Sequence, residues 1–197
     1  MDTYVSWGAK LSDLGIEPTD NVANFFQTGV SHIHNLSVSG GGDKGSVRLS
    51  IGNSNLEGII PNTYYDRTTA RLTGDAEVAP GLKINGTAAY IKSGGNKAQK
   101  GSNLAGLMLS LFRTPVSYNL NDPAEGGYET PEGVQRKYID YFDNPYWSAY
   151  NNTFKNSQDR FMGNTGFNYN YKWLTLDYKV GIDFYTDSRK GIIAIGS

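Results

Sequence analysis

The stretch NLSVSGGGDKGSVRLSIGNSNLEGIIPN, residues 35–62, alternates apolar and polar side chains on both sides of a glycine-rich centre. Leu36 and Val38 alternate with serines before the glycines, and the same alternation resumes over residues 47–51 after them. A period of two places the apolar side chains on one face of a β-strand and the polar ones on the other. We therefore predict an amphipathic hairpin, in which the glycines within residues 40–45 supply positive φ to the turn.

The same alternation recurs along the chain and predicts an all-β fold with about six strands. The predicted strands are residues 32–39, 46–54, 65–78, 82–91, 160–171 and 174–185. Charged side chains inside these strands lie opposite the apolar ones, except for Asp66 and Lys92 near strand ends. The third and sixth strands pass ten residues, whereas soluble strands usually have about 5–6 residues and a bilayer-spanning strand about 9–11. Antiparallel hairpins of this kind are typical of a transmembrane β-barrel.

The lengths of the predicted connections alternate along the chain. The turns at residues 40–45, at 79–81 and near Lys172 are short, whereas residues 55–64 and 94–157 form long connections. Outer-membrane barrels have short periplasmic turns and longer extracellular loops. We therefore expect residues 94–157 to form an extracellular loop.

Two short helices are predicted outside the strands. Leu104, Leu107, Met108 and Leu111 recur at helical spacing, so residues 103–112 are expected to form a helix inside the long loop. One helical turn is expected over residues 21–27, with Asp20 or Asn21 as its N-cap.

The long loop is rich in tyrosine, and four of these residues are candidate contacts for a substrate or a partner protein: Tyr118, Tyr128, Tyr138 and Tyr141. Their flat rings with polar edges suit sugar rings or a protein surface. Tyr146 and Trp147, in contrast, are expected to pack the loop against the rim of the barrel.

Composition excludes several classes of protein. The 197 residues carry a formal net charge of −1, whereas a nucleic-acid-binding protein usually has a basic patch. The chain has no cysteine, so it can form no disulfide and no cysteine metal site. No run of about 18 apolar residues predicts a transmembrane helix, and no leader peptide is expected after Met1.

No catalytic, metal or cofactor site is predicted. His32 and His34 share one face of a strand, but no carboxylate or cysteine nearby completes a metal site. The segment GGGDKG, residues 40–45, lacks the spacing of a phosphate-binding loop. The acidic residues of the long loop could suggest the carboxylate pair of a glycoside hydrolase, but they lie in a segment rich in proline and glycine without a rigid frame. We expect the protein not to be an enzyme.

Several motifs, in order along the chain, resemble the SusC/RagA group of TonB-dependent outer-membrane transporters. They are SWGAKL (6–11), FFQTG (25–29), SVSGGGDK (37–44), EGIIPN (57–62), NPYW (144–147) and DRFMGN (159–164). The resemblance implies a barrel of about 22 strands with a plug in its lumen, in the outer membrane of a Gram-negative, Bacteroidetes-type cell. It also implies import of oligosaccharides or peptides with a SusD-like surface lipoprotein, using energy from the TonB complex.

The chain departs from the whole family pattern in its extent. Residues 1–197 are expected to form a partial barrel without a plug domain or a segment that contacts TonB, so the chain is expected to be a fragment of a longer protein. Two alternatives remain open at this point. One is a soluble all-β carbohydrate-binding module that uses the tyrosine-rich loop, and the other is a fragment of a glycoside hydrolase.

Overall fold

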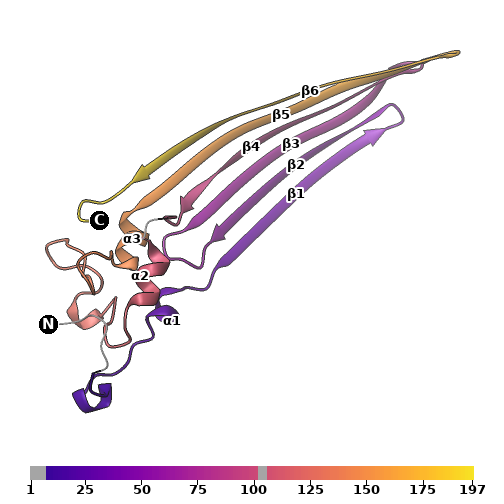
Figure 1. Ribbon diagram of the computed structural model, residues 1–197. Helices are drawn as coiled ribbons and strands as arrows, with labels where there is room; N and C mark the ends of the chain where they lie inside the picture. The colour runs from indigo at the N-terminus through magenta and orange to yellow at the C-terminus, as the bar shows by residue number, and fades with distance from the viewer. Residues whose placement is uncertain (1–7, 102–105) are drawn as a thin grey trace.

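The computed structural model describes residues 8–101 and 106–197, and its centre is one antiparallel sheet of six strands in sequence order (Figure 1). The strands are β1 (Val30–Gly42), β2 (Gly45–Glu57), β3 (Tyr64–Ala79), β4 (Leu82–Lys97), β5 (Thr153–Tyr171) and β6 (Leu174–Ile192). Each strand pairs with the next one along the chain. The predicted all-β class and the six amphipathic strands are confirmed.

The strands extend further than predicted at one end of the sheet. Residues 94–97 still belong to β4 and residues 153–157 to β5, so the long loop covers residues 98–152 and not 94–157. The connection after β2 is likewise shorter than predicted, at residues 58–63. The predicted alternation of short and long connections is still present, because the turns at the other end of the sheet have two residues each, at 43–44, 80–81 and 172–173.

The first hairpin turns differently from the prediction. Its turn residues are Asp43 and Lys44, and the glycines around them do not have positive φ. A Cβ atom at Gly45 would lie 2.4 Å from the carbonyl oxygen of Asp75 and 3.0 Å from the Cα of Ala76. Glycine is therefore required at position 45 by the close approach of β3, and not by the turn.

The register divides the sheet into an apolar and a polar face. One row of paired residues crosses all six strands on the apolar face: Leu36, Ile51, Ala70, Tyr90, Phe161 and Phe184. The next row on that face, toward the long loop, is entirely polar: His34, Asn53, Thr68, Lys92, Asp159 and Thr186. The apolar surface thus ends at a sharp boundary, and the two charges that broke the predicted pattern, Asp66 and Lys92, lie beyond it.

At the end of the sheet where β1, β3 and β5 begin, the described segments before β1 and between β4 and β5 form a small cap (Figure 1). Its helices are η1 (Leu11–Leu14), α1 (Asn21–Phe25), α2 (Leu107–Arg113), η2 (Pro123–Glu125) and α3 (Pro145–Asn151). Within the described part of the chain, no helix has the length and apolar character needed to cross a membrane.

The two predicted helices are present with different bounds. Asp20 caps α1, since its carboxylate accepts a hydrogen bond from the backbone N–H of Ala23 at 2.9 Å. The helix predicted over residues 103–112 begins at Leu107, while residues 103–105 of that prediction lie outside the described residues. Thr114 ends the helix, as its position before a proline predicts.

Candidate functional site

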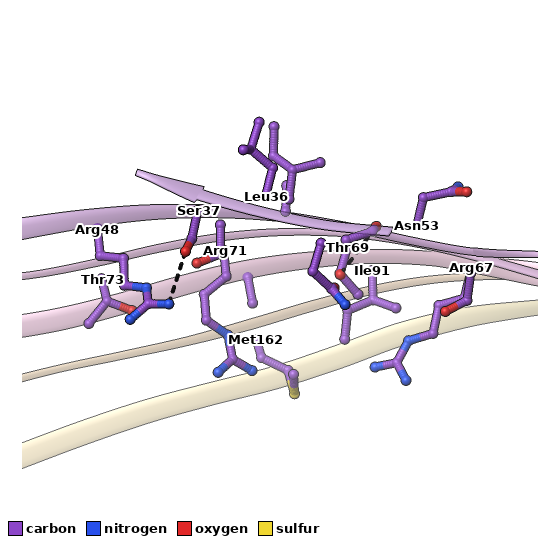
Figure 2. Close-up of a pocket in the computed structure, with 17 residues that line it drawn as sticks. Leu36, Ser37, Arg48, Asn53, Arg67, Thr69, Arg71, Thr73, Ile91 and Met162 are labelled. Carbon is purple, nitrogen blue, oxygen red and sulfur yellow. Dashed lines mark hydrogen bonds between the residues drawn. The ribbon is translucent and has the colours of Figure 1, made fainter. Parts of the chain in front are cut away.

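The polar face of the sheet carries a pocket of about 660 Å³ across β1 to β5 (Figure 2). Ala89 and Ile91 form its buried floor, at 4% and 7% exposure. Arg48, Arg67 and Arg71 project from β2 and β3 on the same side of the sheet, whereas Leu36 points to the other side (Figure 2). Arginine stems can cover apolar atoms while their charged ends stay in water, so this surface is both wet and strongly basic.

These three arginines, which we call the arginine patch, have no carboxylate partner within the described residues. Arg48 donates a hydrogen bond from Nη2 to the hydroxyl oxygen of Ser37 at 3.0 Å. The four ion pairs of the described structure involve none of the three arginines. Their charges are therefore available to a group from outside these strands.

The neighbouring strands β5 and β6 balance their charges internally. Arg160 donates to both carboxylate oxygens of Asp183, at 2.8 Å and 2.5 Å. Arg189 donates to Asp187, with 2.7 Å between its Nη2 and the carboxylate oxygen. The basic character of the polar face is thus concentrated in β2 and β3.

The cap is a second candidate surface and has its own core. Phe25, Leu107, Leu111, Leu120, Tyr146 and Ala149 pack together in its interior. The rings of Phe25 and Tyr146 meet edge to face with centroids 5.0 Å apart, and such aromatic pairs add stability beyond their buried area. Residues far apart in sequence are therefore held as one folded unit above the sheet.

Buried asparagine side chains tie the loops of the cap together. Asn144 caps α3 through the backbone N–H of Tyr146 at 2.9 Å, and its Nδ2 donates to the carbonyl oxygens of Leu120 and Arg136 at 2.7 and 2.8 Å. Asn21 donates to the carbonyl oxygen of Tyr118 at 2.7 Å and accepts from the N–H of Leu120 at 3.0 Å. Satisfied buried polar groups of this kind specify one arrangement of the backbone.

The structure divides the four predicted tyrosines into two groups. Tyr118 and Tyr128 pack against the cap core. Tyr138 and Tyr141 line a pocket of about 430 Å³ with the aromatic ring of Phe142. The exposed ring of Tyr141, at 54%, offers the largest surface of the four to another molecule.

The two core-packed tyrosines have altered ionisation. Burial raises the pKa of the Tyr128 phenol, and the negative charge of Glu129 raises it further. Burial also raises the pKa of Tyr118, against the lowering effect of Arg136. Tyr128 stacks between Tyr146 and Tyr150, with ring planes 13° and 12° from parallel. These contacts give Tyr128 a packing role in the cap.

Tyr146 and Trp147, which the sequence predicts at the rim of the barrel, are buried, and Tyr146 packs within the core of the cap. Tyr146 and Trp147 are 7% and 6% exposed in α3. The indole N–H of Trp147 donates to the hydroxyl oxygen of Ser197 at 3.0 Å. Sequence reasoning missed α3 itself, although Asn144 before Pro145 is a helix-start signal that could have indicated it.

The described residues contain no cluster of three or more His, Cys, Asp or Glu side chains that could hold a metal ion. The rings of His32 and His34 stack with centroids 6.5 Å apart. Both lie on the same side of the sheet as the apolar residues, but in its polar region next to the long loop. Glu125 pairs with Arg136, whose Nη1 also donates to the carbonyl oxygens of Glu125 and Gly127. The acidic loop residue thus has a structural partner.

Comparison with known proteins gives two matches. The chain is similar to "TonB-dependent receptor SusC" of Bacteroides thetaiotaomicron, with 30% identity over 188 residues that cover 85% of this chain and 18% of that protein. Its fold matches a structure of the RagAB peptide importer in the "closed-closed" state, with a TM-score of 0.65 and 18% identity, over 87% of this chain and 19% of that chain. No family model matches the sequence. The chain spans about a fifth of the length of these relatives, and over that region the resemblance indicated by the motifs is confirmed.

Proposed function

We propose that this chain, which matches a region of the SusC/RagA-type TonB-dependent transporters, forms part of the barrel wall of an outer-membrane nutrient importer. In this role the apolar face contacts lipid, the polar face lines the lumen, and the cap lies outside the cell. The plug and the segment that receives energy from TonB belong to other parts of the full-length protein.

The height of the apolar face carries this proposal. On β6, Leu174 and Phe184 are the first and last residues of the unbroken apolar run on that face, before the polar residues Thr186, Ser188 and Lys190. Ten residues of strand extend over roughly 33 Å, and a tilt of about 40° reduces this to a band of roughly 25 Å, the height of the lipid-facing band in outer-membrane barrels. Tyr90, Phe161 and Phe184 form its upper boundary, and Tyr169, Tyr171 and Trp173 lie at its lower end, so aromatic residues occupy both edges.

The position of the cap supports a proposal about the partners. Tyr138 and Tyr141 line a pocket on the loop side of the sheet, where a solute arrives before it reaches the lumen. We assign this surface to contact with a SusD-like lipoprotein or with the incoming oligosaccharide or peptide. RagAB is described as a peptide importer, which makes peptides the first substrates to test.

A soluble carbohydrate-binding module has less support. A sandwich buries the apolar face of one sheet against a second sheet, but the described strands form a single sheet. Leu36, Val38 and Ile182 are 68%, 66% and 56% exposed on its apolar face. Lipid covers such a face in a barrel, whereas water would meet it in the soluble module.

Fractionation and uptake test the proposal in the natural host. The full-length protein that contains this chain is expected in detergent-extracted outer membrane, and deletion of its gene is expected to abolish growth on a peptide or an oligosaccharide that is supplied as a sole nutrient. A deletion of TonB should give the same growth defect. Recovery of the full-length protein in the aqueous fraction would overturn the proposal.

A further inference from the structure

We propose that the arginine patch selects acidic solutes by binding their carboxylate groups in the lumen. This inference rests on the importer function proposed above and adds a substrate class to it: an oligosaccharide or peptide that carries several carboxylates. The patch consists of Arg48, Arg67 and Arg71 on the polar face.

The spacing of the patch suits an oligomer with repeated charges. Arg48 pairs across the strands with Thr73, and Arg71 lies two residues from Thr73 on the same strand. Arg48 and Arg71 are therefore diagonal neighbours, with backbones about 7–8 Å apart, and both can reach one carboxylate. Arg67 lies four residues from Arg71, roughly 13 Å along β3, and can bind a second carboxylate on the next or second-next unit of the solute.

Within the described residues no carboxylate forms an ion pair with the patch. Asp75 is a diagonal neighbour of Arg48 on the same face, but its carboxylate accepts a hydrogen bond from Ser46. No Asp or Glu is among the described residues that line the pocket. Asp183, which shares an adjacent pocket with Arg71, is already engaged by Arg160 at 2.5 Å. Guanidinium groups without a carboxylate partner retain planar pairs of donors that match a carboxylate.

The height of the patch places it in the path of an incoming solute. Arg71 pairs with Ala89, directly beside Tyr90 at the upper edge of the apolar band, and Arg67 pairs with Ser93 above that edge. The patch thus occupies the cap side of the wall. The acidic residues of β3 on the same face, Asp75 and Glu77, lie toward the opposite end, so a solute from the cap meets the basic part first.

The experiment measures binding to the purified full-length transporter in detergent by isothermal titration calorimetry. The probes are tetragalacturonate and tetraglutamate, each compared with a neutral counterpart, the methyl ester of tetragalacturonate and tetraglutamine. We expect at least one acidic probe to bind about tenfold more tightly than its neutral counterpart, since a hydrogen bond to a charged group is worth that ratio or more. The probe that binds identifies the solute as a sugar or a peptide.

Variants then locate the site. Arg48→Gln with Arg71→Gln is expected to remove the preference for the acidic probe. Lys83→Gln with Lys179→Gln is the matched control, because it removes two positive charges from the polar face outside the pocket. Arg71→Lys keeps the charge but loses the planar pair of donors, and we expect it to weaken binding less than Arg71→Gln does.

Three outcomes would overturn the inference. The first is equal affinity for the acidic and neutral probes, and the second is absence of binding by all four probes. The third is a double variant with a lower melting temperature but an unchanged preference for the acidic probe, which would mean that the patch pairs with another part of the transporter. Each of these leaves the importer function intact if uptake persists. Conversely, loss of the outer-membrane location would overturn the importer itself.

Discussion

The hydroxyl group of Tyr146 in α3 donates a hydrogen bond to the backbone carbonyl oxygen of Asn24 in α1, at 2.9 Å. The two residues are 122 positions apart in the sequence. This bond joins the segment that precedes β1 to the end of the long loop, so both segments are held in one cap.

Removal of this hydroxyl should loosen the cap without damage to the sheet. Tyr146→Phe keeps the ring against Phe25 but leaves the Asn24 carbonyl without its donor, at a cost of about 1–3 kcal/mol. Hydrogen exchange of the full-length protein should then accelerate in residues 21–25 and 145–151 and stay unchanged in β2 and β3. Tyr150→Phe is the control, because within the described residues no hydrogen bond of the Tyr150 hydroxyl is recorded. Equal acceleration in both variants would contradict the assigned role.

The two faces of β6 should respond differently to the same new charge. Val180 lies on the apolar face, near the middle of the apolar residues of β6, and pairs with Thr165, while Lys179 lies on the polar face. Val180→Arg should lower the free energy of unfolding by about 2–4 kcal/mol in a bilayer, and Lys179→Arg should leave it nearly unchanged. Urea-induced unfolding in phospholipid vesicles measures both. Similar losses at the two positions would refute the assignment of the faces.

A surface tag in the cap should be accessible from outside intact cells. The turn at Glu132 and Gly133 is exposed, and Gly133 has φ of 79°, whereas residues 125–127 are held by Arg136. A short epitope inserted between Glu132 and Gly133 should therefore bind antibody on whole cells. An epitope in the turn at residues 43–44 is the control and should react only after the outer membrane is broken. The reverse pattern would mean that the topology is inverted.

A methyl group at position 45 should disrupt the first hairpin. The Cβ of Gly45→Ala would collide with the backbone at Asp75 and Ala76, which should cost about 1–3 kcal/mol, as overpacking typically does. Gly40→Ala is the matched control, because its Cβ would have no atom within 4 Å. The melting temperature of the full-length protein should fall for the first variant only. An equal shift in both would show that glycine acts through the flexibility of the unfolded chain.

The alternation in the sequence predicts the strands only where one face is apolar. Leu174 to Phe184 alternate clearly, but residues 94–97 and 153–157 do not, since they are mostly glycine and polar residues, and buried polar groups such as Asn96 leave no hydrophobic signal. Without an apolar face there is no hydrophobic period to read. The ends of β4 and β5 were therefore mistaken for loop.

The cap shows a second limit of sequence reasoning. The tyrosines were recognised as a group, but their roles depend on contacts between distant residues, such as the stacking of Tyr128 on Tyr146. The sequence identifies the three arginines only as charges on one face. Which residues neighbour them, and that no carboxylate lines their pocket, follows from the register of β2, β3 and β4. Local patterns indicate faces, and the register determines which residues on a face are neighbours.

The order of the strands also determines how this wall can assemble. Since each strand pairs with its sequence neighbour, β1 to β4 can join by successive addition as the chain emerges, and β5 with β6 can form a separate hairpin. Only the β4–β5 pairing waits for a long connection, and the entropic cost of closing a loop grows slowly, by about 0.6 kcal/mol for each doubling of its length. We expect the slow step to be the packing of residues 106–152 into the cap. A substitution that slows the folding of the cap would leave the β1–β4 sheet and the β5–β6 hairpin unpaired for longer. Their free strand edges are templates for aggregation, even when the finished sheet is as stable as before.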